Sequence, residues 1–322
     1  MRHGWREKRS SFGYPRGLTS RQPSILPSNQ SPLGALPSRF RKERILVVGC
    51  GDVGVRLLKA QRPQGRWLAL TSTAERIPAL RALGATPLQG NLDRPPTLRR
   101  LAGLAQRVVY LAPPPSQGWT DPRVTALTQA LRRRTAPASV VYASTSGVYG
   151  DCQGERVAET RALAPQTPRA QRRVQAEYTM RFWGRSSGVR VSALRIPGIY
   201  APDREGGTPQ TRLAKGTPVL MAAEDVYTNH IHADDLARAC WRALWLGLPQ
   251  RMYNVSDHSE LKMGDYFDLA ADLFGLPRPP RVSRSSAREQ LPVMLLSFMD
   301  ESRRLVNTRM VQELRLPLRY PT

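Results

Sequence analysis

The chain has 322 residues, a formal net charge of +24 and 40% hydrophobic residues, a composition suited to a globular core. It contains no run of about 18 apolar residues, which excludes a membrane span. Its three scattered cysteines, Cys50, Cys152 and Cys240, exclude a disulfide framework and predict a reducing, cytoplasmic location.

Residues 1–43 are rich in Ser, Pro, Gly and Arg and show no helical or alternating period. Such a segment cannot bury enough apolar surface to order itself, so we expect a disordered basic tail without a catalytic role. An arginine-rich, acid-poor leader peptide is the alternative. We expect the remainder, residues 44–322, to form the folded part of the chain.

A glycine-rich turn follows the first predicted strand, the short apolar run 45–48. Gly49, Gly51 and Gly54 have the spacing G-x-G-x-x-G, and a helical pattern comes after them. In a dinucleotide site these glycines permit a tight turn, a close approach of backbone to pyrophosphate, and close helix–strand packing. The free N–H groups of the helix start attract phosphates. The predicted cofactor contacts in this turn are Gly49, Gly51, Asp52, Val53 and Gly54.

Strands and helices alternate after this turn, which is typical of a parallel sheet with helices on both faces. We therefore expect an α/β fold class, a Rossmann-like doubly wound sheet with a small C-terminal substrate lobe, mainly about residues 197–322. The predicted strands are 67–71, 86–89, 107–111, 139–143, 189–196 and 252–255. The predicted helices are 75–83, one capped by Asp93 before Pro95, 124–133, 169–186, 232–246, 263–274 and 301–314.

The tip of the second predicted strand indicates the choice of cofactor. It ends on the hydroxyl side chains of Thr71 and Ser72, and Arg76 follows closely. An acid at this point usually binds the ribose of NAD, whereas an arginine accommodates the 2′-phosphate of NADP. We therefore predict NADP, with NAD as the alternative because Glu75 could serve the ribose if the register shifts.

Hydroxyl side chains follow the fifth predicted strand, in the segment 144–150. Ligands of doubly wound sheets bind beyond the carboxyl ends of the strands, so these hydroxyls are expected beside the nicotinamide. A turn whose hydroxyls cap backbone groups is the alternative. The other predicted cofactor contacts at this edge are Leu111, Ala112, Pro113, Ser144 and Pro197.

The segment 144–150, STSGVYG, resembles a motif of the extended short-chain dehydrogenases/reductases, the sugar-nucleotide epimerase and dehydratase superfamily. Residues 194–200, 230–237 and 253–255 resemble three further motifs of that family in the same order. The glycine spacing is similar to that of an atypical bacterial branch. The resemblance implies an NAD(P) cofactor and a small-molecule substrate, phosphorylated or nucleotide-linked, and it leaves a homodimer open.

The chain departs from this family at the catalytic pair. The family places a tyrosine and, four residues later, a lysine on the long helix, and the lysine lowers the pKa of the tyrosine. Counting back from Glu177, which matches a recurrent acid of the family, these positions fall on Arg169 and Arg173. A guanidinium stays protonated and is therefore a poor general acid.

The candidate catalytic residues are Thr145, Arg173 and Tyr149. The resemblance assigns the Thr145 hydroxyl to a substrate oxygen and Arg173 to the nicotinamide ribose, while Tyr149, Tyr200 or water would supply the proton. We predict an NAD(P)-dependent oxidoreductase or a sugar-nucleotide-epimerase-like protein. The alternatives are a non-catalytic dinucleotide-binding redox sensor or scaffold and, resting on charge alone, a nucleic-acid-binding protein.

Two further clusters have two interpretations each. Arg169, Arg172 and Arg173 could bind a phosphate, or they could form a solvated helix face. His230 and His232 would share one face of a strand, but the resemblance makes that segment a structural helix start. We therefore predict no metal site.

Overall fold

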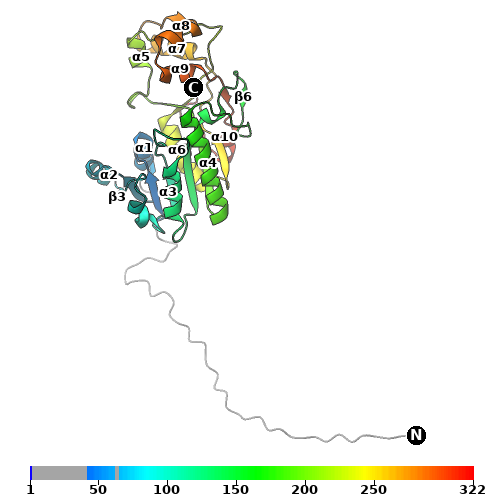
Figure 1. Ribbon diagram of the computed structural model, residues 1–322. Helices are drawn as coiled ribbons and strands as arrows, with labels where there is room; N and C mark the ends of the chain where they lie inside the picture. The colour runs from blue at the N-terminus through cyan, green and yellow to red at the C-terminus, as the bar shows by residue number, and fades with distance from the viewer. Residues whose placement is uncertain (2–41, 62–64) are drawn as a thin grey trace. The chain divides into compact units, whose positions relative to one another are not determined.

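A parallel sheet of seven strands forms the centre of the structure, a computed structural model that describes residues 42–61 and 65–322 as well as Met1 (Figure 1). The tail predicted over residues 1–43 lies almost wholly outside these described residues. The strands are β1 (Arg44–Val48), β2 (Arg66–Thr71), β3 (Thr86–Gln89), β4 (Arg107–Tyr110), β5 (Ser139–Thr145), β7 (Arg190–Ile196) and β11 (Arg251–Asn254).

The order of the strands across the sheet is β11-β7-β5-β4-β1-β2-β3, and every neighbouring pair runs parallel. This confirms the predicted Rossmann-like sheet. The direction in which the chain adds strands reverses between β1 and β4. In doubly wound sheets such a switch point opens a crevice at the carboxyl ends of the strands, where ligands bind.

The apolar run in β1 shows why the sheet is covered on both faces. Successive side chains of a strand point to opposite faces. Ile45 and Val47 accordingly belong to one buried cluster, and Leu46 and Val48 belong to another. All four side chains have no exposed surface. A strand without a polar face needs helices on both sides, which is the layer structure that the chain forms.

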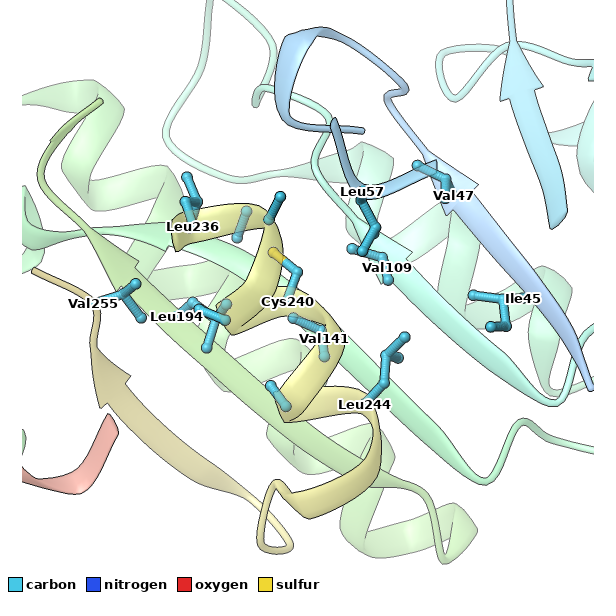
Figure 2. Packing of buried hydrophobic residues seen from close by; sticks show 14 of the residues in the cluster. Ile45, Val47, Leu57, Val109, Val141, Leu194, Leu236, Cys240, Leu244 and Val255 are labelled. Atoms are coloured by element: carbon cyan, nitrogen blue, oxygen red, sulfur yellow. The ribbon is translucent and has the colours of Figure 1, made fainter. Parts of the chain in front are cut away.

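Helices from distant parts of the chain cover the two faces. The face of Ile45 and Val47 packs against α1 (Asp52–Gln61) and α6 (Ala233–Leu246); Figure 2 shows α6 lying across the strands. The opposite face packs against α3 (Pro122–Leu131) and α4 (Pro168–Ser187). In the part of the chain that the structure describes, no helix combines the length and apolar character needed to cross a membrane.

The remaining elements are short, apart from α7. The helical ones are η3 (Ala74–Arg76), α2 (Ile77–Ala82), η4 (Pro95–Leu101), η5 (Ser146–Tyr149), α5 (Gln210–Ala214), α7 (Met263–Phe274), α8 (Arg284–Gln290), α9 (Val293–Met299) and α10 (Thr308–Glu313). The extended ones pair as β8 (Gly198–Tyr200) with β10 (His230–His232), β9 (Val219–Leu220) with β12 (Arg281–Val282), and β6 (Arg156–Val157) with β13 (Arg304–Leu305).

A separate hydrophobic cluster gathers α5, α7, α8 and α9 at one end of the described unit (Figure 1). Its buried side chains include Leu213, Val219 and Phe267. We expected a C-terminal lobe mainly over residues 197–322. This range also supplies β11 to the seven-stranded sheet and α6, which packs on one face of that sheet. The elements of this smaller cluster therefore come from two stretches of chain, one on each side of α6 and β11.

Two predicted helix features are wrong. The final helix expected over 301–314 is divided into β13 and α10, because the N–H of Arg304 donates to the carbonyl of Glu155 at 3.0 Å and holds this stretch extended. Asp93 does not cap a helix; it accepts hydrogen bonds from Arg123 at 2.7 Å. The second and third residues after Asp93 are both prolines, which lack the N–H groups that a cap would bind.

A buried ion pair connects α4 to the sheet directly beneath the carboxyl ends of the strands. Nη2 of Arg195 on β7 lies 2.8 Å from Oε2 of Glu177 on α4, and the two side chains are only 4% and 3% exposed. Ser144 on β5 donates its hydroxyl to the same carboxylate at 2.6 Å. Arg195 also donates to the hydroxyl of Tyr149, which in turn donates to Asn254. The network therefore joins α4, β5, η5, β7 and β11.

We predict that Glu177→Gln lowers the free energy of unfolding by about 3–5 kcal/mol, because it leaves the Arg195 guanidinium buried without its counter-charge. Urea unfolding followed by circular dichroism measures this change. Asp272→Asn is the matched control, since it removes a carboxylate from an exposed pair with Arg278. Equal unfolding midpoints for the two variants would show that the buried pair does not hold the fold together.

Candidate functional site

A cavity of about 280 Å³ opens where β1, β4, β5 and β7 end. This is the edge of the sheet at which doubly wound folds bind their ligands. Most of the predicted site residues converge here although they are far apart in the sequence. Those that line the cavity are Gly49, Gly51, Asp52, Val53, Gly54, Leu111, Pro113, Ser144, Thr145, Arg173 and Pro197.

The glycine turn has the backbone geometry that each glycine was predicted to supply. Gly49 has φ +81°, and a Cβ there would lie 2.4 Å from the backbone nitrogen of Ala112. A Cβ on Gly51 would meet no atom within 4 Å, so the backbone is open towards the cavity. A Cβ on Gly54 would lie 3.1 Å from Sγ of Cys50, which reflects the close packing of α1 on β1. Ala112 thus forms the wall behind the turn and does not line the cavity.

The residues expected to select the cofactor lie beside the cavity rather than in its wall. Thr71 is buried, and its hydroxyl donates to the carbonyl of Thr73 at 3.1 Å. Ser72 is exposed. Nη2 of Arg76 donates to the carbonyl of Cys50 at 2.6 Å. Its guanidinium therefore lies against the glycine turn, within reach of a ligand bound there.

The two hydroxyls at the end of β5 have different environments. Strand β5 continues to Thr145, two residues beyond the predicted end. The Ser144 hydroxyl is buried and donates to Glu177, so it is engaged inside the fold. Oγ1 of Thr145 accepts the N–H of Gly147 at 3.3 Å, which leaves its own hydrogen free to donate into the cavity.

Neither predicted phenol lines the cavity. Tyr149 is 1% exposed, and its hydroxyl lies between Asn254 and Arg195. Burial raises the pKa of Tyr149 to about 12. Burial also raises the pKa of Tyr200 to about 12, and its ring stands edge-on to His232 at a centroid distance of 5.2 Å. The hydroxyl of Tyr149 is therefore part of the buried hydrogen-bond network around Arg195, and it does not face the cavity.

The described part of the chain contributes three arginines to the cavity wall: Arg169 and Arg173 from α4, and Arg204 from the loop after β8. Arg204 could not be assigned to the site from the sequence, because residues 201–229 have no periodicity that would orient it. Arg204 donates to Asp52 at 3.0 Å. The loop is thereby tied to the start of α1.

The guanidinium of Arg56 strengthens the tie between this loop and the helix starts. It contacts Asp52 on α1 at 3.1 Å, Asp234 on α6 at 2.7 Å, and Asp203 in the loop at 2.6 Å. These three carboxylates raise the pKa of Arg56 above its usual value against the opposing effect of desolvation, the largest single influence. Ion pairs of Arg56 thus connect α1, α6 and the loop after β8 at the mouth of the cavity.

The two histidines have structural contacts. Nδ1 of His232 accepts the N–H of Asp234 at 3.2 Å, so His232 caps α6. His230 stacks on Tyr266 at a centroid distance of 4.2 Å, and desolvation lowers its pKa to about 4. Over residues 42–61 and 65–322, no group of three or more His, Cys, Asp or Glu side chains could hold a metal ion.

The chain resembles known proteins in sequence over part of its length. The model of the NAD dependent epimerase/dehydratase family matches residues 45–256. A dTDP-glucose 4,6-dehydratase from Mycolicibacterium smegmatis is 31% identical over 140 residues, which cover 41% of this chain and 42% of that protein. The chain therefore matches less than half the length of this curated relative.

Solved structures share the fold over most of the chain. A functionally unknown conserved protein from Silicibacter pomeroyi has a TM-score of 0.70 and 30% identity, with 87% of this chain and 95% of that chain covered. A double mutant of a dTDP-glucose 4,6-dehydratase from Streptomyces venezuelae, with NAD bound, has a TM-score of 0.68 and 20% identity, with 86% and 92% covered.

We predict that alanine destabilises the fold at one glycine of the turn and not at another. Gly49→Ala forces a side chain into positive φ and into the backbone of Ala112, so it should lower the free energy of unfolding by more than about 1–2 kcal/mol. Gly51→Ala should leave thermal unfolding near that of the unchanged protein, because its methyl group enters open space. A stable Gly49→Ala variant would contradict the geometry of the turn.

Proposed function

The chain belongs to the NAD dependent epimerase/dehydratase family, and on that premise we propose that it binds NADP and transfers hydride between this cofactor and a small, nucleotide-linked substrate. One observation carries the proposal. The open backbone of Gly51 and the free hydroxyl of Thr145 line the same cavity at the switch point of the sheet. The first is suited to a pyrophosphate and the second to a substrate oxygen.

The residues of the turn fit a dinucleotide. The space beside Gly51, which a Cβ would fill, lets phosphate oxygens approach backbone N–H groups. Helix α1 begins at Asp52, so its unpaired N–H groups and positive dipole end point to the same space. These features support phosphate binding whether or not the ligand carries a 2′-phosphate.

The preference for NADP rests on Arg76. Its guanidinium lies against the carbonyl of Cys50, beside the glycine turn, and the second strand has no carboxylate at its tip. Glu75 is exposed next to Arg76 and is the residue that would serve NAD. The Streptomyces venezuelae dehydratase has NAD bound, so the two cofactors must be compared directly in this protein.

A bound nicotinamide would supply or accept the hydride. The side chains of this protein hold the reacting groups in place: Thr145 donates a hydrogen bond to the substrate oxygen, and Arg173 orients the nicotinamide ribose. No tyrosine is among the described residues that line the cavity. We therefore assign the proton that accompanies the hydride to water rather than to a phenol.

A second candidate is a non-catalytic dinucleotide-binding sensor or scaffold. Arg169, at the position where the family resemblance expects the catalytic tyrosine, lines the cavity and cannot act as a general acid at neutral pH. A protein that kept the cofactor site without this tyrosine would bind the dinucleotide and respond to its redox state without turnover.

Titration of NADPH and NADH, followed by nicotinamide fluorescence, tests the cofactor site. We expect Gly51→Ala to weaken both by at least about tenfold, because its methyl group occupies the phosphate space. Arg76→Ala should lower the NADPH-to-NADH affinity ratio by about 10- to 100-fold, the value of a charge-assisted hydrogen bond. Arg81→Ala, an exposed arginine on α2, is the charge-matched control. If neither cofactor binds, the proposed function and its sensor alternative both fail.

Turnover against a panel of nucleotide sugars and simple carbonyl compounds separates the enzyme from the sensor. We expect Thr145→Val to reduce kcat by about 10²–10³-fold with the KM for NADPH unchanged, the effect of losing one hydrogen-bond donor to a developing oxyanion. Thr145→Ser retains the hydroxyl and should retain activity. NADPH binding without turnover on any compound would favour the sensor, and unchanged kcat in Thr145→Val would remove Thr145 from the mechanism.

A further inference from the structure

Positive charge in the cavity exceeds negative charge. Among the described residues that line it, the charged ones are Arg169, Arg173, Arg204 and Asp52. Asp52 already accepts hydrogen bonds from Arg56 at 3.1 Å and from Arg204 at 3.0 Å. The negative charge of Asp52 is therefore neutralised by Arg56 and Arg204 at the mouth of the cavity. No other acidic side chain among the described lining residues pairs with Arg169 or Arg173 of α4.

Arg173 is buried with unused hydrogen-bonding capacity. Only 6% of its surface is exposed. Nη1 donates to two neutral acceptors, the hydroxyl of Tyr142 at 3.1 Å and the carbonyl of Ala112 at 3.4 Å, while Nε is buried without a partner. A buried guanidinium usually has a carboxylate or phosphate opposite it, since neutral acceptors offset little of the cost of removing its charge from water. Nη2, for which the structure gives no hydrogen bond and which is not among the buried unpaired atoms, is therefore the donor that Arg173 can offer to an anion in the cavity.

Arg169 lies one turn earlier on the same face of α4. Its guanidinium has no hydrogen bond or ion pair with any described residue. The residue is exposed, yet partial desolvation, together with the charges of Arg173 and Arg172, lowers its pKa. These positive charges stand at the positive end of the helix dipole, and the first turn of α4 contains no acid. An anion at this point would relieve repulsion that the chain itself leaves uncompensated.

The nearby acids form no ion pair with Arg173. Glu177 is held by Arg195 at 2.8 Å. Asp121 is fully buried and accepts the N–H groups of Arg123 and Val124 at the start of α3. Burial raises the pKa of Asp121, and the charge of Arg173 opposes this rise from beyond ion-pair distance. The sequence interpretation as a solvated helix face is wrong for Arg172 and Arg173, which are buried, whereas Arg169 is exposed.

We propose that Arg169, together with the donors of Arg173 that the nicotinamide ribose leaves free, forms an anion subsite that takes a carboxylate or phosphate group of a second ligand, next to the dinucleotide. Both groups present paired oxygens that match the planar donors of a guanidinium. The location beside the dinucleotide rests on the proposed function, whereas the anion subsite itself does not. The subsite gives Arg169 a role in substrate choice: the substrate carries its negative charge close to its reacting carbon.

Thermal unfolding of the full chain tests the subsite, because an anion that binds only the folded state raises the unfolding midpoint. Inorganic phosphate and malonate are titrated separately at constant ionic strength against chloride. We expect at least one of them to give a saturable rise, and the stronger of the two identifies a phosphorylated or a carboxylated ligand. Arg169→Gln should weaken this binding by about 10- to 100-fold, and Arg169→Lys should restore part of it.

Arg185→Gln is the matched control. It removes the same charge from an exposed position in the last turn of the same helix, and it should bind the anion as the unchanged protein does. Equal midpoint shifts in Arg169→Gln and Arg185→Gln, or no saturable shift in the unchanged protein, would overturn the subsite.

Repeating the titration with NADPH present decides where the anion binds. A shift that persists at saturating NADPH supports a separate subsite. A shift that NADPH abolishes in a competitive manner overturns it, because the anion then occupies the pyrophosphate position of the cofactor. If NADPH does not bind at all but phosphate or malonate still binds through Arg169, the proposed function fails while the anion subsite stands.

Discussion

The buried ion pair between Arg195 and Glu177 is the constraint on which the site depends. A charge pair removed from water is costly, and it is tolerated only when further hydrogen bonds satisfy both groups. Here the hydroxyl of Ser144 donates a hydrogen bond to the carboxylate of Glu177, and the hydroxyl of Tyr149 accepts one from the guanidinium of Arg195. The pair thereby sets the position of α4 relative to the ends of β5 and β7. All three elements contribute residues to the wall of the cavity.

This constraint also accounts for the distribution of charge around the cavity. The acid of α4 points into the fold to meet Arg195, so the helix presents only its arginines to the cavity. Asp52 forms ion pairs with Arg56 and Arg204 at the mouth of the cavity. The interior thus combines an open glycine turn, one free hydroxyl and unneutralised guanidinium groups, an arrangement better suited to binding anions than to exchanging protons.

Tyr149 lies outside the cavity because the same network holds its hydroxyl between Arg195 and Asn254. The hydroxyl-rich segment at the end of β5 therefore contributes Ser144 and Thr145 to the cavity wall and no phenol. The hydroxyl of Ser144 is itself bonded to Glu177, so Thr145 is the residue of this segment whose hydroxyl hydrogen is free for a ligand.

Much of the fold and of the glycine turn could be predicted from the sequence, since both follow from local pattern. The buried run 45–48 specifies a strand, and the glycine spacing specifies the turn. The β13 segment could not be predicted, because a hydrogen bond to Glu155 keeps Arg304 out of a helix. Nor could the orientation of Arg204, Tyr149 or Arg173, which depends on partners distant in the chain. The sequence by itself determined the parallel sheet and the glycine turn at its carboxyl edge, because both follow from local pattern; only tertiary packing decided which charged and hydroxyl groups face the cavity.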